Sequence, residues 1–330
     1  MPASELARLL SPEAVRSLGA LRRARVLVTG GAGFLGGWAL SVLALADEQL
    51  GLGLELSVLT RDRARFAARL PALAGRVRVF EGDIAALPRG IASPTHVLHA
   101  AAPPHRGTSA EELSRVIVEG TRGLLLASAR WGTRRFLFVS SGAVYGASCR
   151  GPLSEDDELT GHATPYGEAK RRAEALCAAA PGIETVRARG FAFLGPGLPL
   201  DGTFAAGNFL RDAARGGPIR LNSRGDSVRT YLDAQEAGAW LAVMLAAGTS
   251  GAVYNLGGAR RLRVAELARL IARAAGLDDG SVELGEDLAA DSYVPALARA
   301  RTRLALTPLV EINESIVDAL FWARNQLPKA

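Results

Sequence analysis

Tyr166 and Lys170, four positions apart, are the residues of this sequence best suited to moving a proton. The chain has 39 basic residues, and only Lys170 and Lys329 are lysines. The lysine after this tyrosine therefore departs from the chain's strong preference for arginine. In a helix, residues at i and i+4 share a face, which would place a compact ammonium beside the phenol and favour phenolate. Such a pair can exchange a proton near neutral pH. The alternative is a solvated lysine that follows a core tyrosine on a surface helix.

A glycine-rich turn between an expected strand and an expected helix indicates where a phosphate-bearing ligand binds. The strand covers 25–29 and the helix about 34–46. Glycines in such a turn permit a tight bend, close approach of the backbone to a pyrophosphate, and close helix–strand packing. The phosphates then bind at the helix N-terminus. The predicted dinucleotide site contains Gly30, Gly33, Phe34, Leu35 and Gly36.

The second expected strand, 54–60, ends in Leu59-Thr60-Arg61 and not in an acid. An acid at this point binds the ribose 2′-hydroxyl of NAD, whereas an arginine suits the 2′-phosphate of NADP. Arg61, with Arg63 nearby, therefore favours NADP as cofactor, and NAD is the alternative. A solvated loop arginine in an arginine-rich chain would leave this choice open.

Strands and helices alternate through the first half of the chain. Further strands are expected at 76–80, 96–101, 136–140 and 186–193, with a long helix over 109–131. This alternation predicts an α/β fold, a Rossmann-type doubly wound parallel sheet with a smaller mixed C-terminal substrate-binding lobe. Ligands of such sheets bind beyond the carboxyl ends of the strands, where Ser141 and the 102–105 loop fall.

The expected organisation has three parts. Residues 1–22 form a helical N-terminal extension, because Leu6, Leu9 and Leu10 have helical spacing. Residues 23–193 form the dinucleotide-binding domain, whose sheet parts of 228–258 complete. Residues 194–330 form mainly the substrate-binding lobe. The helices expected in the second half cover 204–214, 234–245, 261–275 and 311–325.

Taken in order, these segments resemble the extended short-chain dehydrogenase/reductase family, in its nucleotide-sugar epimerase, dehydratase and reductase branch. The matching motifs are TGGAGFLG at 29–36, GDI at 82–84, HAAA at 99–102, EGT at 119–121, SSGAVYG at 140–146, YGEAK at 166–170, RGFAFLGP at 189–196, RTYL at 229–232, YNLGG at 254–258 and YVP at 293–295. Each motif alone is weak, and their order and spacing make the combination specific.

The resemblance implies a catalytic triad of Ser141, Tyr166 and Lys170. Tyr166 would exchange the proton of a sugar hydroxyl or carbonyl, Lys170 would lower the pKa of Tyr166 and hold the nicotinamide ribose, and Ser141 would orient the reacting oxygen. The cofactor contacts that it implies are Asp83, Ile84, Ala100, Ala101, Tyr166 and Lys170.

The resemblance also implies a nucleotide-diphosphate sugar as substrate. Ser141 would contact the sugar, and Asn208 and Arg229 would face the diphosphate, for which an arginine is a good ligand. The alternative for Arg229 is an ion pair with Asp226 or Asp233. The family usually forms homodimers through two helices per subunit, here those within 111–130 and 164–179.

Two departures from the family's motifs narrow the expected reaction. Ile117 stands where family members commonly have asparagine, so a polar contact near the cofactor is lost. Gly142 and Ala143 stand where the 4,6-dehydratases carry an Asp-Glu pair that eliminates water, and related decarboxylases keep an acid at the second position. Neither Gly nor Ala carries a proton, so dehydration and decarboxylation are disfavoured.

The expected reaction is hydride transfer at C4 of an activated hexose, by a 4-ketoreductase or a 4-epimerase. The alternatives are a 4,6-dehydratase that takes its acid and base from elsewhere, a reductase of a non-sugar ketone, and, least favoured, a non-catalytic dinucleotide-sensing protein. His99 is expected to be structural or to line the cofactor, while His105 and His162 could touch substrate.

Composition excludes several other classes of protein. A hydrophobic content of 48% with 22% charged residues is globular, and the net charge of +6 is scattered, without a basic block for nucleic acid. No apolar run approaches the ~20 residues of a membrane span. Cys149 and Cys177 lack metal or redox spacing, so we predict no metal site and a cytoplasmic location.

Overall fold

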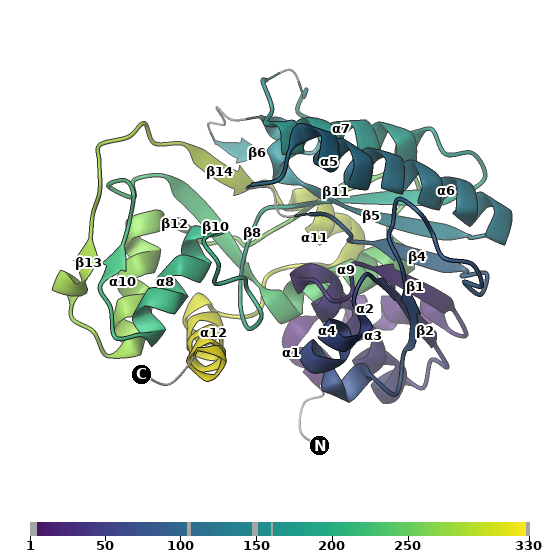
Figure 1. The fold of residues 1–330 in the computed structure, drawn as a ribbon, viewed down its shortest axis with the longest axis horizontal. Coiled ribbons are helices and arrows are strands. Elements are labelled where there is room, and N and C mark those ends of the chain that lie inside the picture. The colour runs from purple at the N-terminus through teal and green to yellow at the C-terminus, as the bar shows by residue number, and fades with distance from the viewer. Residues whose placement is uncertain (1–4, 104–106, 147–150, 160, 328–330) are drawn as a thin grey trace.

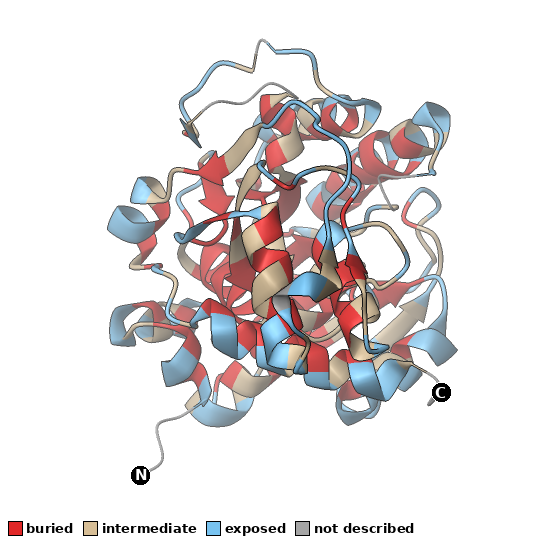
Figure 2. Cartoon of the chain, turned by 90° about the vertical axis from the view of Figure 1, so that its left-hand side faces the viewer, coloured by how far each residue is buried: buried red, intermediate tan, exposed pale blue. Residues whose placement is uncertain are grey.

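A large parallel sheet with helices on both faces dominates the molecule, and a smaller lobe lies beside it (Figure 1). The computed structural model describes residues 5–103, 107–146, 151–159 and 161–327. Figure 2 shows that the buried residues concentrate in the sheet and on the helix faces that meet it.

The large sheet has seven strands in the order β11-β7-β5-β4-β1-β2-β3, and every neighbouring pair is parallel. Strand order reverses between β1 and β4, which creates the crevice where doubly wound sheets bind their ligands. The predicted fold class is therefore confirmed. The strands are β1 (Arg25–Thr29), β2 (Glu55–Thr60), β3 (Arg78–Glu81), β4 (His96–His99), β5 (Arg135–Ser141), β7 (Glu184–Gly190) and β11 (Val253–Leu256).

Helices cover the two faces because alternate strand residues point in opposite directions. Val26 and Val28 of β1 enter the core beneath α3 and α9, whereas Leu27 enters the core beneath α6 and α7. The first face carries α3 (Phe34–Leu50), α4 (Arg63–Arg69), α9 (Ala234–Ala247) and α11 (Ala298–Leu304). The second carries α5 (Ala110–Leu113), the π-helical turn η3 (Ser114–Glu119), α6 (Gly120–Trp131) and α7 (Pro165–Ala178).

The N-terminal segment docks on its own chain. Helices α1 (Glu5–Leu9) and α2 (Pro12–Ser17) and the 3-10 turn η1 (Leu18–Leu21) pack against α9. Leu6, Leu18 and Leu21 are fully buried in the core that α3 and α9 share. The apolar spacing therefore reflects packing within this molecule.

The smaller lobe is built on three helices that pack together, α8 (Ala205–Ala214), α10 (Val264–Ala275) and α12 (Ile312–Gln326). The strands between the lobe and the large sheet are β6 (Pro152–Leu153), β8 (Ala192–Leu194), β10 (Val228–Asp233), β12 (Arg261–Arg263) and β14 (Ser292–Pro295), with β9 (Ile219–Arg220) and β13 (Val282–Glu283) paired at the lobe's edge. The remaining short turns are η2 (Pro71–Leu73), η4 (Gly142–Tyr145) and η5 (Asp279–Ser281).

Three expected elements differ from those observed in type or in strand pairing, beyond small shifts of their ends. The helix expected over 261–275 starts at Val264, because 261–263 pair with β10 as a strand. The strand expected over 186–193 ends at Gly190, and β8 leaves the large sheet to pair with β10. The helix expected over 109–131 contains the π-helical turn η3. Within the part of the chain that the structure describes, no helix is long and apolar enough to cross a membrane.

Candidate active site

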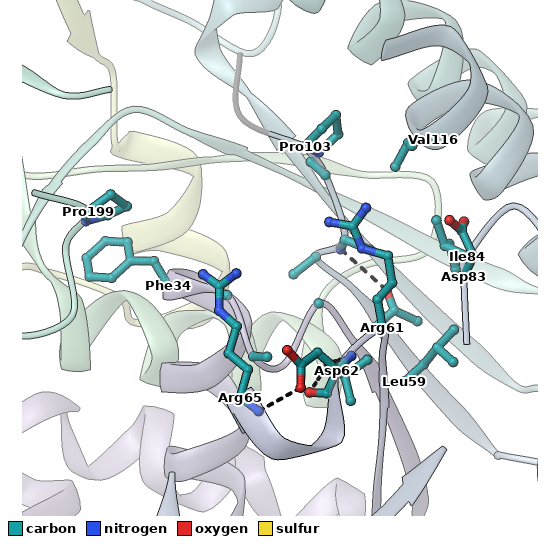
Figure 3. A pocket seen from close by; sticks show the side chains of 18 of the residues that line it. Phe34, Leu59, Arg61, Asp62, Arg65, Asp83, Ile84, Pro103, Val116 and Pro199 are labelled. Atoms are coloured by element: carbon teal, nitrogen blue, oxygen red, sulfur yellow. Dashed lines mark hydrogen bonds between the residues drawn. The ribbon is translucent and has the colours of Figure 1, made fainter. Parts of the chain in front are cut away.

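A cavity of about 480 Å³ opens at the carboxyl ends of β1, β2 and β4, where the strand order reverses (Figure 3). One wall comes from the large sheet and its loops, and the other comes from Pro199, Asp201, Thr203 and Phe204 on the way into α8. The predicted residues that line it are Gly30, Gly33, Phe34, Arg61, Asp83, Ile84, Ala100, Ala101 and Tyr166. Leu35, Gly36, Ser141, Lys170, Asn208 and Arg229 are not among the lining residues.

The glycine turn after β1 is too tight for side chains. A Cβ atom at Gly30 would lie 2.7 Å from the Ala101 nitrogen, and one at Gly33 would lie 2.9 Å from the Gly30 oxygen. A Cβ at Gly36 would overlap the same oxygen. The turn therefore brings backbone N–H groups and the N-terminus of α3 to the cavity, which is the arrangement that binds a pyrophosphate.

Arginines of the β2–α4 segment line the cavity together with the Asp62 and Asp83 carboxylates. Arg61, Arg65 and Arg69 all line it, and Figure 3 shows the guanidinium groups of Arg61 and Arg65 pointing into the same opening. Asp62 caps α4 by accepting from the Arg65 backbone N–H at 2.8 Å. Arg63 instead turns away and donates to the Val79 carbonyl at 2.7 Å.

Asp83 and Ile84 close the cavity beside these arginines. The Asp83 carboxylate accepts from the Ala85 N–H at 2.8 Å and lies 3.5 Å from the Arg115 guanidinium. The backbone hydrogen bond and the arginine lower the pKa of Asp83, so the carboxylate stays charged. Ile84 packs against Gly120 in the turn that follows η3.

Tyr166 reaches Ser141 because α7 packs tightly on the turn after β5. Thr164 caps α7 by accepting from the Gly167 N–H at 3.2 Å, and Pro165 occupies the first turn. A Cβ at Gly167 would lie 2.5 Å from the Ala143 oxygen, so the glycine allows this close approach. Ser141 ends β5, accepts from the Ala143 N–H at 3.1 Å, and forms a hydrogen bond with the Tyr166 phenol.

Lys170 lies one helical turn after Tyr166 and is buried, with 2% of its surface exposed. Its ammonium donates to the Val139 carbonyl at 2.8 Å and lies 4.7 Å from the Phe138 ring centroid. The distance to the Tyr166 ring centroid is 5.7 Å. The structure thus places the three predicted catalytic residues together, and Lys170 is not a solvated surface lysine.

The pKa values of this pair do not follow the expectation that Lys170 lowers the pKa of Tyr166. Burial raises the pKa of the Tyr166 phenol to about 12, although its hydrogen bond with Ser141 acts in the opposite direction. Burial lowers the pKa of Lys170 to about 8, and the nearby Glu174 carboxylate opposes that shift. In both groups, desolvation outweighs these opposing influences.

Glu174 continues the same face of α7, four residues after Lys170. Its buried carboxylate accepts from the Ser140 hydroxyl at 2.6 Å and from Arg189 at 2.8 and 3.0 Å. The Arg189 guanidinium also lies 4.8 Å from the Tyr145 ring centroid. A buried ion pair therefore ties α7 to β5 and β7 directly behind the predicted catalytic residues.

His99 is a structural residue of the core. Its ring nitrogens contact the Thr29 hydroxyl at 2.7 Å and the Thr121 hydroxyl at 3.0 Å. Burial, and secondarily the charge of Lys170, lowers the pKa of His99 to about 3, which keeps the ring neutral. Ile117 is buried in the π-helical turn, and its carbonyl accepts from the Thr121 hydroxyl.

The residues predicted to bind a substrate diphosphate lie in the second half of the chain with partners of their own. Arg229 of β10 donates to both oxygens of Asp291, at 2.9 and 3.0 Å, so its ion-pair partner is neither Asp226 nor Asp233. The Asn208 amide oxygen on α8 accepts from Arg211 at 3.2 Å.

The other histidines and cysteines considered in the sequence make no contact with the cavity where they are described. His162 is exposed, and Cys177 is a buried free thiol whose pKa burial raises to about 12. His105 and Cys149 lie outside the described residues. Across the described ranges, no three His, Cys, Asp or Glu side chains are grouped to hold a metal ion.

Several lining residues escaped the sequence analysis. Arg65 and Arg69 follow Arg61 at four-residue intervals, and reading Asp62 as a helix cap would have placed them on one face of α4. The Pro199–Phe204 wall carries no local signal, since it reaches the cavity only when the lobe packs beside the large sheet.

Comparisons with known proteins agree with this architecture. Residues 26–257 match the family model described as "NAD dependent epimerase/dehydratase family". The chain is 30% identical over 314 residues to a dTDP-glucose 4,6-dehydratase from Streptomyces griseus, which covers 90% of this chain and 93% of that protein.

Two solved structures are similar over most of their length. The first is the dTDP-glucose 4,6-dehydratase DesIV from Streptomyces venezuelae, with NAD and TYD bound, at a TM-score of 0.81 and 26% identity, covering 91% of this chain and 97% of that chain. The second is MoeE5 in complex with UDP-glucose and NAD, at a TM-score of 0.76 and 26% identity, covering 92% and 100%.

Proposed function

The chain belongs to the NAD dependent epimerase/dehydratase family of extended short-chain dehydrogenase/reductase enzymes, and from this membership we propose that it transfers hydride at C4 of a nucleotide-diphosphate hexose. The reaction is that of a 4-ketoreductase or a 4-epimerase. The observation that carries the proposal is the meeting of Ser141, Tyr166 and Lys170 beside the cavity at the strand ends, with no carboxylate at positions 142 and 143.

A nicotinamide dinucleotide, when bound, supplies the acceptor and donor of the hydride. The glycine turn fits its pyrophosphate, because side chains at Gly30 and Gly33 would collide with neighbouring backbone and disrupt the tight turn that lines the cavity. We assign the 2′-phosphate of NADP to Arg61 and Arg65, whose guanidinium groups share one opening. NAD is the alternative, which the NAD in the two similar structures and the Asp62 carboxylate in this cavity favour.

Each of the three residues has a distinct task. Tyr166 holds the proton that moves to or from the oxygen at C4, and its raised pKa keeps the phenol protonated in the protein alone. Ser141, hydrogen-bonded to Tyr166, orients the reacting oxygen. The Lys170 ammonium, held by the Val139 carbonyl, stabilises negative charge on the phenol and binds the nicotinamide ribose.

The test is turnover by the wild-type protein and by Tyr166→Phe, with NADPH or NADH and a series of 4-keto and 4-hydroxy sugar nucleotides. Removing the phenol hydroxyl should lower kcat by about 10²- to 10⁴-fold, because proton transfer is lost. The dinucleotide affinity should change little. A Phe variant with wild-type turnover would reject Tyr166 as the proton donor, and a wild-type protein active only on non-sugar ketones would reject the substrate class.

A 4,6-dehydratase is the second candidate, because the chain is 30% identical to such an enzyme over 90% of its length. That reaction needs an acid and a base to remove water after hydride transfer. Gly142 and Ala143 cannot serve, so an acid from elsewhere in the chain would have to take that task. Formation of a 4-keto-6-deoxy product would establish this candidate over the first.

A further inference from the structure

The segment 195–204, which we call the strap, joins β8 to α8 and forms the wall that the smaller lobe contributes to the cavity. Its second half is fixed to that lobe. The Leu200 carbonyl accepts from the Arg211 guanidinium of α8 at 3.3 Å. A Cβ atom at Gly207 of α8 would overlap the Pro199 oxygen, so helix and strap lie in direct contact.

The first half of the strap is held by side chains that belong to the other wall of the cavity. The Arg69 guanidinium, at the end of α4, donates to the Gly197 carbonyl at 2.8 Å. The Trp38 indole of α3 donates to the Pro196 carbonyl at 2.9 Å. Phe34, the first residue of α3, packs against the apolar core of the lobe. These contacts join the strap to the two helices that follow the glycine turn and β2.

The hydrogen bond between Arg69 and Gly197 depends on a glycine at that point of the strap. The φ angle of Gly197 is +87°, and a Cβ atom there would lie 2.8 Å from the Arg69 Nη2 atom. The absence of a side chain lets the carbonyl meet the guanidinium. Arg69 lines the cavity and is half-buried, so this bond with a charged donor lies at the edge of the cavity and is partly shielded from water.

A dinucleotide in this cavity would lie between the two walls, because both line the same space. It keeps its contacts with the strap only while the strap stays at its present distance from the glycine turn. The bonds from Arg69 and Trp38 fix that distance for the first half of the strap. Loss of either bond would let this half move away, and such changes act mainly on the dissociation rate of a ligand.

Resting on the proposed function, we propose that Arg69 is a cofactor-positioning residue, which holds the strap across the bound nicotinamide dinucleotide and sets the rate at which the dinucleotide dissociates. Trp38 is the second point of attachment. Both bonds end on backbone carbonyls of the strap and not on a carboxylate or a ligand. The effect of Arg69 is therefore the same for NAD and NADP, in contrast to that of Arg61 and Arg65.

The test is the dissociation rate of NADH and of NADPH from the full-length protein, followed by stopped-flow nicotinamide fluorescence during displacement by an excess of the oxidised dinucleotide. Arg69→Met should raise both rates about tenfold and by the same factor, since it removes a hydrogen bond from a charged donor. Trp38→Phe should raise both rates about threefold, because it removes a bond between neutral groups. If Arg69→Met fails to fold, Trp38→Phe decides alone.

Arg22→Met is the matched control. Arg22 also donates to a glycine carbonyl, that of Gly51 at 2.9 Å, but it does not line the cavity. Its dissociation rates should equal those of the wild-type protein. In the cofactor-free protein, hydrogen exchange of the strap amides should be faster in Arg69→Met than in the wild-type protein and in Arg22→Met. Unfolding temperatures of all variants separate misfolding from a change at the strap.

Unchanged dissociation rates in Arg69→Met would overturn the inference while dinucleotide binding stands. A rise for NADPH alone, or a rise in Arg69→Met that Trp38→Phe does not share, would also overturn it, because Arg69 would then act as a charge near the phosphates and not through the strap. Binding of a dinucleotide without turnover of any sugar nucleotide would overturn the proposed function alone. A wild-type protein that binds neither dinucleotide would overturn both.

Discussion

Burial pushes both Tyr166 and Lys170 toward their neutral forms. The pKa of the phenol rises to about 12 and that of the ammonium falls to about 8. A lysine that must stay charged in such a place needs a nearby anion, and the charge of the Glu174 carboxylate raises the pKa of Lys170. We therefore propose that Glu174 is a positioning residue that acts through Lys170.

Replacing Glu174 by Gln should alter the pH dependence of turnover. Lys170 is charged below its pKa of about 8 and loses its proton as pH rises through that value, so kcat/KM should fall on the alkaline side. Without the Glu174 carboxylate the pKa of Lys170 falls further, and the alkaline limb should move to lower pH by about one unit. The measurement is a pH profile of kcat/KM for both proteins.

Glu168→Gln provides the control for that profile. Glu168 lies on the same helix, but its side chain is half exposed and pairs with Arg171 instead. Its alkaline limb should coincide with that of the wild-type protein. Coincident limbs for Glu174→Gln and the wild-type protein would show that Glu174 does not act through Lys170.

We propose that the turn from β2 into α4 decides between NAD and NADP. It directs Arg61 and Arg65 into the cavity and Arg63 toward the Val79 carbonyl. The difference arises from the start of α4, where the Asp62 cap fixes the direction of the first helical turn. The geometry at the start of α4 thus directs Arg61 and Arg65, but not Arg63, toward the cavity.

Alanine at Arg61 or Arg65 should lower the preference for NADPH over NADH by about 10- to 100-fold, since each loses a hydrogen bond to a charged group. Arg63→Ala, the matched control, should keep the wild-type preference. The measurement is kcat/KM for each cofactor with one substrate. If Arg61→Ala and Arg65→Ala both keep the wild-type ratio, the arginines do not bind a 2′-phosphate.

At the scale of the element, sequence patterns predict the features that depend only on residues close together in the chain. The glycine turn, the strand over 25–29 and the pairing of Tyr166 with Lys170 each depend on a few neighbouring residues, and all are present in the structure. The prediction of a helix at 261–263 is wrong. These residues form a strand only because they pair with β10, which lies more than thirty residues earlier in the chain. Propensity alone cannot supply that partner.

At the scale of the whole molecule, the lobe and the large sheet complete one site from distant parts of the chain. The contact of Tyr293 with Gly142 and the ion pair of Arg229 with Asp291 join residues that no pattern in the sequence links. The sign of the Tyr166 pKa shift also depends on the total burial around the phenol. These features require the packed molecule, whereas the family could be inferred from the motifs in order.

We propose that this protein moves hydride at C4 without removing water from the sugar. The most direct measurement follows the product by mass spectrometry and NMR after incubation with 4-keto and 4-hydroxy sugar nucleotides and both nicotinamide cofactors. We expect a 4-hydroxy sugar, either reduced at the expense of NADPH or inverted at C4 with no net use of cofactor. A 4-keto-6-deoxy sugar, which is a product that has lost water, would contradict this proposal.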